Sequence, residues 1–82
     1  MCYVYIIKFI YGKIYIGSTS DLKRRLQAHQ KRGDFELVYY EAYKAESDAR
    51  RREHNLKYFG KAYGQLKGRI KESVELCSKG AG

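Results

Sequence analysis

The amino-acid sequence predicts an α+β domain in which a small three-stranded antiparallel sheet is flanked by three helices, in the chain order ββαβαα. Two observations predict this class. Three segments are rich in β-branched and aromatic residues, which favour strands. Three others are rich in helix formers or repeat apolar residues at steps of three and four. The strands are expected at residues 2–10, 13–17 and 35–43, and the helices at residues 20–31, 46–59 and 62–77.

The first two strands are expected to form a β-hairpin that turns at Gly12. Residues directly opposite each other in an antiparallel pair share a face, so the length of the loop decides whether Tyr5 and Tyr15 can share a site. A two-residue turn would put the two tyrosines on opposite faces. A three-residue loop over residues 10–12, with Gly12 in the left-handed position, would put them on the same face. We therefore predict the three-residue loop.

In the first expected helix, the 3.6-residue period separates exposed charges from inward-facing ones. Arg25 and His29 fall on the same face as Leu22 and Leu26, whereas Arg24 faces solvent. The pattern alone leaves two interpretations of Arg25, a side chain that extends past the apolar face to water or a functional group. His29 is likewise either a packed histidine or a catalytic group.

In the second expected helix, Glu53 lies beside the apolar stripe formed by Ala49 and Leu56. A carboxylate held near a core needs a cation as its partner. The pattern leaves open whether that partner is Arg52 or Arg25, in a structural ion pair, or a bound metal ion.

The length and composition limit the size of the protein and indicate the kind of partner that it binds. The 82 residues are sufficient for one small core, so we expect one domain over residues 1–77 and a flexible tail over residues 78–82. The formal net charge of +8 favours a polyanionic partner, above all nucleic acid. Cys2 and Cys77 lack the spacing of a zinc site, and no apolar run could span a membrane, so we expect a reduced, cytoplasmic protein.

Four spaced elements carry a family resemblance. Tyr5 ends the triplet Tyr-Val-Tyr, Tyr15 begins the triplet Tyr-Ile-Gly ten residues later, Arg25 follows after ten more, and Glu53 lies in the second expected helix. Together they resemble the GIY-YIG nuclease family, in particular its small stand-alone members. The chain is also similar to the catalytic domain of the bacterial excision-repair incision subunit and of GIY-YIG homing endonucleases.

The sequence departs from the family pattern at two places. Tyr3 stands where the first triplet of the family has glycine. Several relatives also carry an asparagine late in the domain that helps to order the site, and the nearest position here is Gly68.

The resemblance implies a metal-dependent endonuclease that hydrolyses phosphodiester bonds of DNA. Arg25 would bind the scissile phosphate, and Glu53 would hold Mg²⁺ or Mn²⁺, a hard cation suited to oxygen ligands. Tyr5, Tyr15 or His29 would position the attacking water and accept its proton, and the sequence leaves this choice open. The wider partners that the resemblance implies are RNA, branched or single-stranded DNA, and a larger repair or recombination protein.

Basic side chains outside the site are expected to bind phosphates without reading sequence. They are Lys8, Lys13, Lys23, Arg24, Lys31 and Arg32, with parts of 50–52.

The main alternative to an endonuclease is a non-catalytic nucleic-acid-binding module of the same fold. A structural adaptor is a further alternative, but it requires a large exposed apolar patch that nothing in the helix patterns demands. An RNA-binding protein fits the charge but leaves the spacing of the four motif residues to coincidence.

Overall fold

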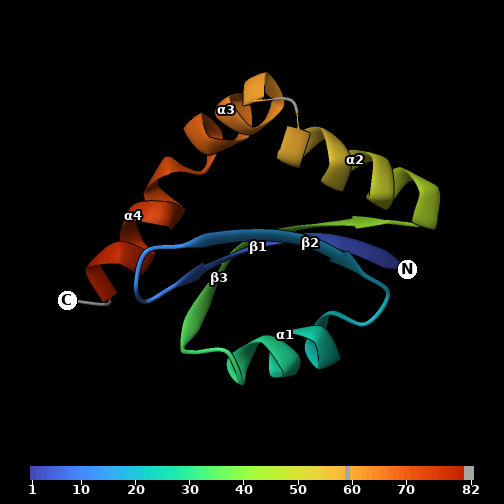
Figure 1. The fold of residues 1–82 in the computed structure, drawn as a ribbon. Helices are drawn as coiled ribbons and strands as arrows, with labels where there is room; N and C mark the ends of the chain where they lie inside the picture. Colours follow the sequence, from blue (N-terminus) through green and yellow to red (C-terminus); the bar gives the residue numbers. More distant parts are fainter. Residues whose placement is uncertain (59, 81–82) are drawn as a thin grey trace.

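A three-stranded antiparallel sheet forms the centre of the protein, as the sequence predicts (Figure 1). The computed structural model describes residues 1–58 and 60–80, with the backbone alone over residues 76–80. The strands are β1 (Cys2–Phe9), β2 (Ile14–Thr19) and β3 (Phe35–Tyr43). The spatial order is β2-β1-β3, so β1 is central and β2 forms one edge of the sheet.

Helices cover both faces of the sheet (Figure 1). The helix α1 (Leu22–Gln30) lies on one face and begins at Asp21, whose side chain accepts a hydrogen bond from the Arg24 amide. The helices α2 (Glu46–Tyr58) and α3 (Gly60–Arg69) lie on the other face, and α4 (Lys71–Gly80) contacts β3. The predicted ββαβαα order is confirmed.

The alternating side chains of β1 divide the core into two halves. Tyr5, Ile7 and Phe9 are buried on the α1 face. Val4 and Ile6 are buried on the opposite face. The second half is completed by three buried helical residues: Ala49, Leu56 and Leu66. The central strand thus supplies both halves of the core.

The hairpin has the predicted three-residue loop. Tyr5 lies opposite Gly17 in the register, which places Tyr15 diagonally across on the same face. The Phe9 amide donates to the Lys13 carbonyl over 2.9 Å and closes the loop. Gly12 has a φ of 97°, a left-handed conformation that glycine adopts without a steric penalty.

The third predicted helix, over residues 62–77, is divided at Ile70 into α3 and α4. The Ile70 amide still donates to the Leu66 carbonyl over 3.0 Å, and the Val74 amide donates to the Ile70 carbonyl over 3.1 Å. These two hydrogen bonds connect Ile70 to both helices at the bend. Ile70 is half-buried against the core, and the bend carries α4 to β3.

Two predicted elements extend into residues outside the described part of the chain. Residue 59, at the predicted end of the second helix, lies outside the described residues. The tail expected at residues 78–82 begins inside α4, whose backbone continues to Gly80, and its last two residues also lie outside the described part. Over residues 1–58 and 60–80, no helix combines the length and apolar character that crossing a membrane requires.

Candidate functional site

A buried tyrosine–histidine pair joins the sheet to α1. The Tyr5 hydroxyl lies 2.7 Å from Nε2 of His29, and the two ring centroids are 5.7 Å apart. Tyr5 is completely buried and His29 is only 5% exposed. His29 therefore faces inward from α1, as the helical period predicted, with its partner in the central strand.

The surroundings of this pair set its protonation. Burial is the main cause that raises the pKa of Tyr5 well above its ordinary value, so Tyr5 keeps its proton. Burial also lowers the pKa of His29, and the charges of Arg25 and Arg32 lower it further. Because Tyr5 is protonated and His29 is neutral, the tautomer of His29 decides which of the two groups donates this hydrogen bond.

Tyr15 extends this cluster toward the edge of the sheet. Its ring centroid lies 4.6 Å from that of His29 and 6.1 Å from that of Tyr5. The Tyr15 hydroxyl is also a hydrogen-bond partner of Tyr5. Tyr15 is half-buried, unlike Tyr5, so it is the phenol of the two that reaches water.

Gly17 makes room for the buried pair. A Cβ atom at this position would lie 2.6 Å from the Tyr5 hydroxyl oxygen and 2.9 Å from Cε1 of Tyr15. Both distances are too short for any side chain. The glycine of the Tyr-Ile-Gly triplet is therefore required for the close approach of the two tyrosines to β2.

Glu53 projects from α2 toward β2, where both of its oxygens are engaged. The Ser18 hydroxyl donates to Oε1, and Nζ of Lys57 lies 2.7 Å from Oε2. Burial alone would raise the pKa of Glu53, but the hydrogen bonds from Lys57 and Ser18 and the charge of Arg25 hold it below its ordinary value. Glu53 is therefore an ionised carboxylate.

The structure corrects the predicted partners of Glu53. Arg52 instead forms a two-pronged ion pair with Glu41 of β3, with distances of 3.0 and 3.1 Å. Tyr39 and Tyr43 also donate to Glu41, over 2.7 and 2.5 Å. Arg52 faces β3, because successive residues of a helix point in different directions. Its network joins α2 to the sheet and contributes to the fold.

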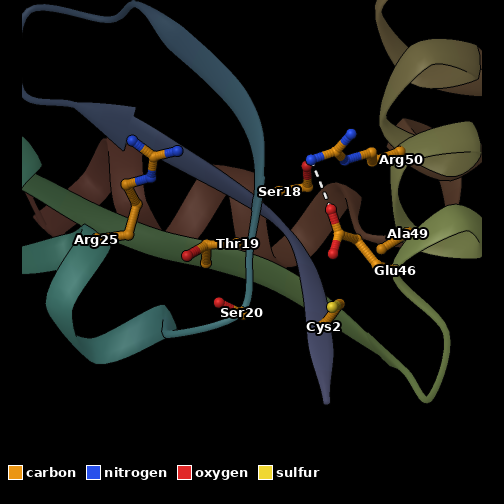
Figure 2. Close-up of a pocket in the computed structure, with 8 residues that line it drawn as sticks. All are labelled: Cys2, Ser18, Thr19, Ser20, Arg25, Glu46, Ala49 and Arg50. Atoms are coloured by element: carbon orange, nitrogen blue, oxygen red, sulfur yellow. Dashed lines mark ion pairs between the residues drawn. The ribbon is translucent and has the colours of Figure 1, made fainter.

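Arg25 is exposed: it shares the helical face of Leu22 and Leu26, but its side chain extends past that face to water, one of the interpretations that the sequence pattern leaves open. It lines a cavity of about 240 Å³ at the end of β2, together with Ser18 and, from α2, Glu46 and Arg50. Figure 2 shows Arg25 on one side of β2, and Arg50 with its ion-pair partner Glu46 on the other. Leu22 and Leu26 fill the inner face of α1, which leaves Arg25 at its rim.

The predicted residues therefore form two groups that meet at β2. Tyr5, Tyr15 and His29 contact one another on the α1 side. Glu53 lies on the α2 side, in a hollow that shares Ser18 and Arg50 with the Arg25 cavity. The positive charge of Arg25 acts on Tyr5, His29 and Glu53, so the two groups share one electrostatic environment.

The predicted phosphate-binding residues lie mostly on the α1 side. Lys23 and Arg24 are exposed on α1, and Lys31 and Arg32 are exposed in the turn after it. Lys13 is exposed beside the hairpin loop. Lys8 is half-buried, and its even position in β1 directs it to the opposite face of the sheet.

Sequence reasoning missed two residues that hold Glu53 in place. Lys57 lies one helical turn after Glu53, and the four-residue spacing of an acidic and a basic residue was a usable signal for this ion pair. Ser18 directly follows the Tyr-Ile-Gly triplet. Its role depends on the position of α2 against the edge strand, which no local pattern indicated.

Comparison with known proteins agrees with this fold and with these motifs. Residues 1–64 match the GIY-YIG catalytic domain family. The match covers most of the chain and includes every residue of the two groups described above. The protein belongs to the GIY-YIG catalytic domain family, a family of nucleases.

Two relatives match this chain over 66 and 68 residues. The chain is 35% identical over 66 residues to the UPF0213 protein CPE1444 of Clostridium perfringens, covering 70% of this chain and 71% of that protein. It is 31% identical over 68 residues to the UPF0213 protein SSP2268 of Staphylococcus saprophyticus, covering 72% and 83%. No solved structure matches the chain significantly.

Proposed function

We propose that this protein is a metal-dependent endonuclease that hydrolyses phosphodiester bonds of DNA. The observation that carries the proposal is the convergence at β2 of an ionised carboxylate, Glu53, an exposed guanidinium, Arg25, and a cluster of two phenols and an imidazole. These groups can supply charge stabilisation, alignment and proton transfer, which phosphodiester hydrolysis requires.

Cationic side chains around Ser18 would bind the scissile phosphate. Arg25 lines the cavity at the end of β2 and makes no ion pair with any residue that the structure describes. Its planar guanidinium can donate to two phosphate oxygens at once. Arg50 lines the same cavity and would contribute a second positive charge. The two arginines would thus approach the phosphate from opposite sides of the edge strand.

Tyr15 is the best candidate to accept the proton of the attacking water. Tyr5 is completely buried and holds its proton firmly, and its hydroxyl is committed to His29. Tyr15 reaches solvent and contacts both. A negative charge formed on the Tyr15 oxygen would be stabilised by the Tyr5 hydroxyl, which would turn to donate to it, while His29 in its Nε2–H tautomer would donate to Tyr5. Tyr5 and His29 are then positioning residues.

The residues around Glu53 fit a single hard cation such as Mg²⁺ or Mn²⁺. Glu53 is ionised and partly open to solvent, and the Ser18 hydroxyl beside it is a further oxygen donor. Magnesium sites in phosphate chemistry often use one or two carboxylates together with waters and substrate oxygens. Within the described residues there is no cluster of three acidic, histidine or cysteine side chains, so Glu53 would be the one carboxylate ligand. A bound cation would stabilise charge on the leaving oxygen.

A nicking assay tests the proposal. Supercoiled plasmid is incubated with the protein and Mg²⁺ or Mn²⁺, and the conversion to the open circular form is measured. We expect nicking that chelation abolishes. Arg25→Ala and Glu53→Gln should each lower the rate by about 10²–10³, the usual effect of removing one charge-stabilising group.

Two control variants each remove one charged side chain of the same kind from outside the proposed site. Arg24→Ala removes the neighbouring arginine, which is exposed on α1, and Glu72→Gln removes an exposed carboxylate from α4. Neither should lower the rate more than a few-fold. If plasmid nicking survives Glu53→Gln or proceeds in chelator, the metal-dependent mechanism is wrong.

A second candidate is a nucleic-acid-binding module that does not cut. The observation that favours it is the engagement of both Glu53 oxygens by Ser18 and Lys57, with which a metal ion would have to compete for the carboxylate. This candidate predicts tight, salt-sensitive binding to DNA that Glu53→Gln leaves unchanged, with no nicking under any metal condition.

A further inference from the structure

Two tyrosines form an aromatic pair at the end of the sheet that α1 leaves open. Tyr3 of β1 and Tyr40 of β3 have ring centroids 6.2 Å apart at an interplanar angle of 62°. Tyr40 lies opposite Tyr5 in the register, so both residues of the pair are on the α1 face. Yet Tyr40 is 53% exposed, because the short helix does not cover it.

These rings form one wall of a groove of about 530 Å³ against α1. The helix supplies the other wall through Leu22 and Leu26, and Lys23 lies at the rim. The volume is within the range of about 300–1,000 Å³ that is typical of small-molecule sites. The groove is thus apolar inside and aromatic on one side, and its polar lining includes one acidic residue, Asp21, and one basic residue, Lys23.

The groove adjoins the cavity in which the scissile phosphate is proposed to bind. Ser20 lines both hollows. Arg25, which lines the phosphate cavity, lies on the same helix as Leu22 and Leu26 of the groove. A phosphate at Arg25 and a base in the groove would therefore occupy neighbouring hollows that share Ser20. The charge of the whole protein, +8, favours the polyanion that carries such bases.

We propose that this groove, defined by Tyr3, Leu22, Leu26 and Tyr40, binds one unpaired nucleobase of the substrate strand next to the scissile phosphate. Every base has an aromatic face that can stack on a tyrosine, whereas a base inside a duplex is already stacked on its neighbours. The groove would therefore direct the protein toward DNA with an unpaired or extrahelical base. This inference rests on the proposed nuclease function for the position of the phosphate.

Tyr3, which lines the groove, is one of the residues that depart from the family pattern. It occupies the position at which the first triplet of the family has glycine, and glycine has no side chain that could form a wall. A base-binding groove at this place would therefore be a property of chains that carry an aromatic residue there.

The test measures binding rather than cleavage. In chelator, the fluorescence anisotropy of a labelled DNA duplex is compared with that of the same duplex carrying one extrahelical 2-aminopurine, whose own fluorescence reports stacking. We expect the protein to bind the second DNA about 10-fold more tightly and to quench the 2-aminopurine, in line with the usual strength of base–tyrosine stacking. Tyr40→Ala should remove both the preference and the quenching, and Tyr40→Phe should retain them.

Tyr11→Ala is the matched control, since Tyr11 is 63% exposed in the hairpin loop and lies outside the groove. It should leave the preference unchanged. Equal affinity of the wild type for the two duplexes, or a preference that Tyr40→Ala retains, would overturn the groove while leaving the nuclease proposal in place. Absence of binding to either duplex would overturn both proposals.

Discussion

The ammonium group of Lys57 lies 2.7 Å from Oε2 of Glu53 and 5.7 Å from the centre of the Tyr15 ring. One side chain therefore joins the carboxylate on the α2 side of the sheet to the phenol on the α1 side. Lys57 thus occupies one of the two carboxylate oxygens of Glu53, the residue proposed to hold the divalent cation. The pair keeps Glu53 ionised, and a bound cation would compete with Lys57 for the carboxylate.

Replacing Lys57 by methionine should strengthen metal binding. The variant keeps a chain of similar length but removes the competing charge. Partly exposed ion pairs contribute about 0.2–1 kcal/mol, so removing the competing lysine should raise the Mn²⁺ affinity about 1.4- to 5-fold. Isothermal titration calorimetry with MnCl₂ measures it directly. Lys61→Met, which removes an exposed lysine from α3, should leave the affinity unchanged. A weaker affinity in Lys57→Met would mean that Lys57 supports the cation rather than competing with it.

Gly17→Ala should destabilise the fold. The added methyl group would lie 2.6 Å from the Tyr5 hydroxyl oxygen, and Tyr5 is completely buried and cannot move aside freely. Overpacking of this kind costs about 1–3 kcal/mol of unfolding free energy, measured by urea denaturation. Gly64→Ala makes the same change in α3, where a Cβ meets no atom within 4 Å, and it should stabilise the protein by up to about 1 kcal/mol. Equal stability of the two variants would contradict the close approach at Gly17.

Stability should fall as the pH is lowered through the ordinary pKa of histidine, 6.5. His29 has a lowered pKa in the folded protein, so below pH 6.5 the unfolded chain takes up a proton that the folded chain does not. The stabilisation is complete above pH 6.5 and is lost as the pH decreases. Glu53 and Glu41, whose pKa values are also lowered, lose their contributions only below their ordinary value of 4.5.

Urea denaturation between pH 8 and pH 5 isolates the contribution of His29. His29→Gln keeps a hydrogen-bond acceptor for Tyr5 but cannot titrate. Its unfolding free energy should depend less on pH over this interval than that of the wild type. His54→Gln, which replaces the exposed histidine of α2, should leave the dependence as it is. A wild-type curve that is flat from pH 8 to pH 5 would show that His29 is not held neutral by burial.

Arg52→Met should destabilise the protein more than Arg50→Met. Arg52 and Glu41 have side-chain exposures of 27% and 16%, so removing the arginine leaves a largely buried carboxylate with only the two tyrosine donors. We expect a loss of about 1–3 kcal/mol, because a largely buried carboxylate loses its charged partner and two of its hydrogen bonds. Arg50 and Glu46 have exposures of 73% and 62%, and exposed pairs of this kind contribute about 0.3–0.5 kcal/mol. Thermal or urea denaturation of both variants compares them.

The sequence predicted those features that depend on neighbouring residues. The strand over residues 35–43 and the three-residue loop follow from residue preferences and from the geometry of paired strands. The inward position of His29 follows from the period of a helix. Ala49 and Leu56, placed in the core by the same period, are both buried.

Features that depend on how the elements pack could not be predicted in this way. Arg25 shares a helical face with Leu22 and Leu26, but the narrow contact of α1 with the sheet leaves it exposed. The choice of Lys57 over Arg52 as the partner of Glu53 depends on where β3 presents Glu41. The bend at Ile70 likewise follows from contacts of α3 and α4 with distant parts of the chain.

The length of the hairpin loop determines which face of the sheet each side chain of β2 occupies. Tyr15 and Ser18 project from opposite faces of β2, one toward His29 and the other toward Glu53. Deleting or inserting a single residue within 10–12 would exchange these faces and send each side chain to the wrong partner, whereas a change of two residues would keep every assignment. Related chains should therefore vary the length of this loop only in even steps, unless a bulge restores the original parity.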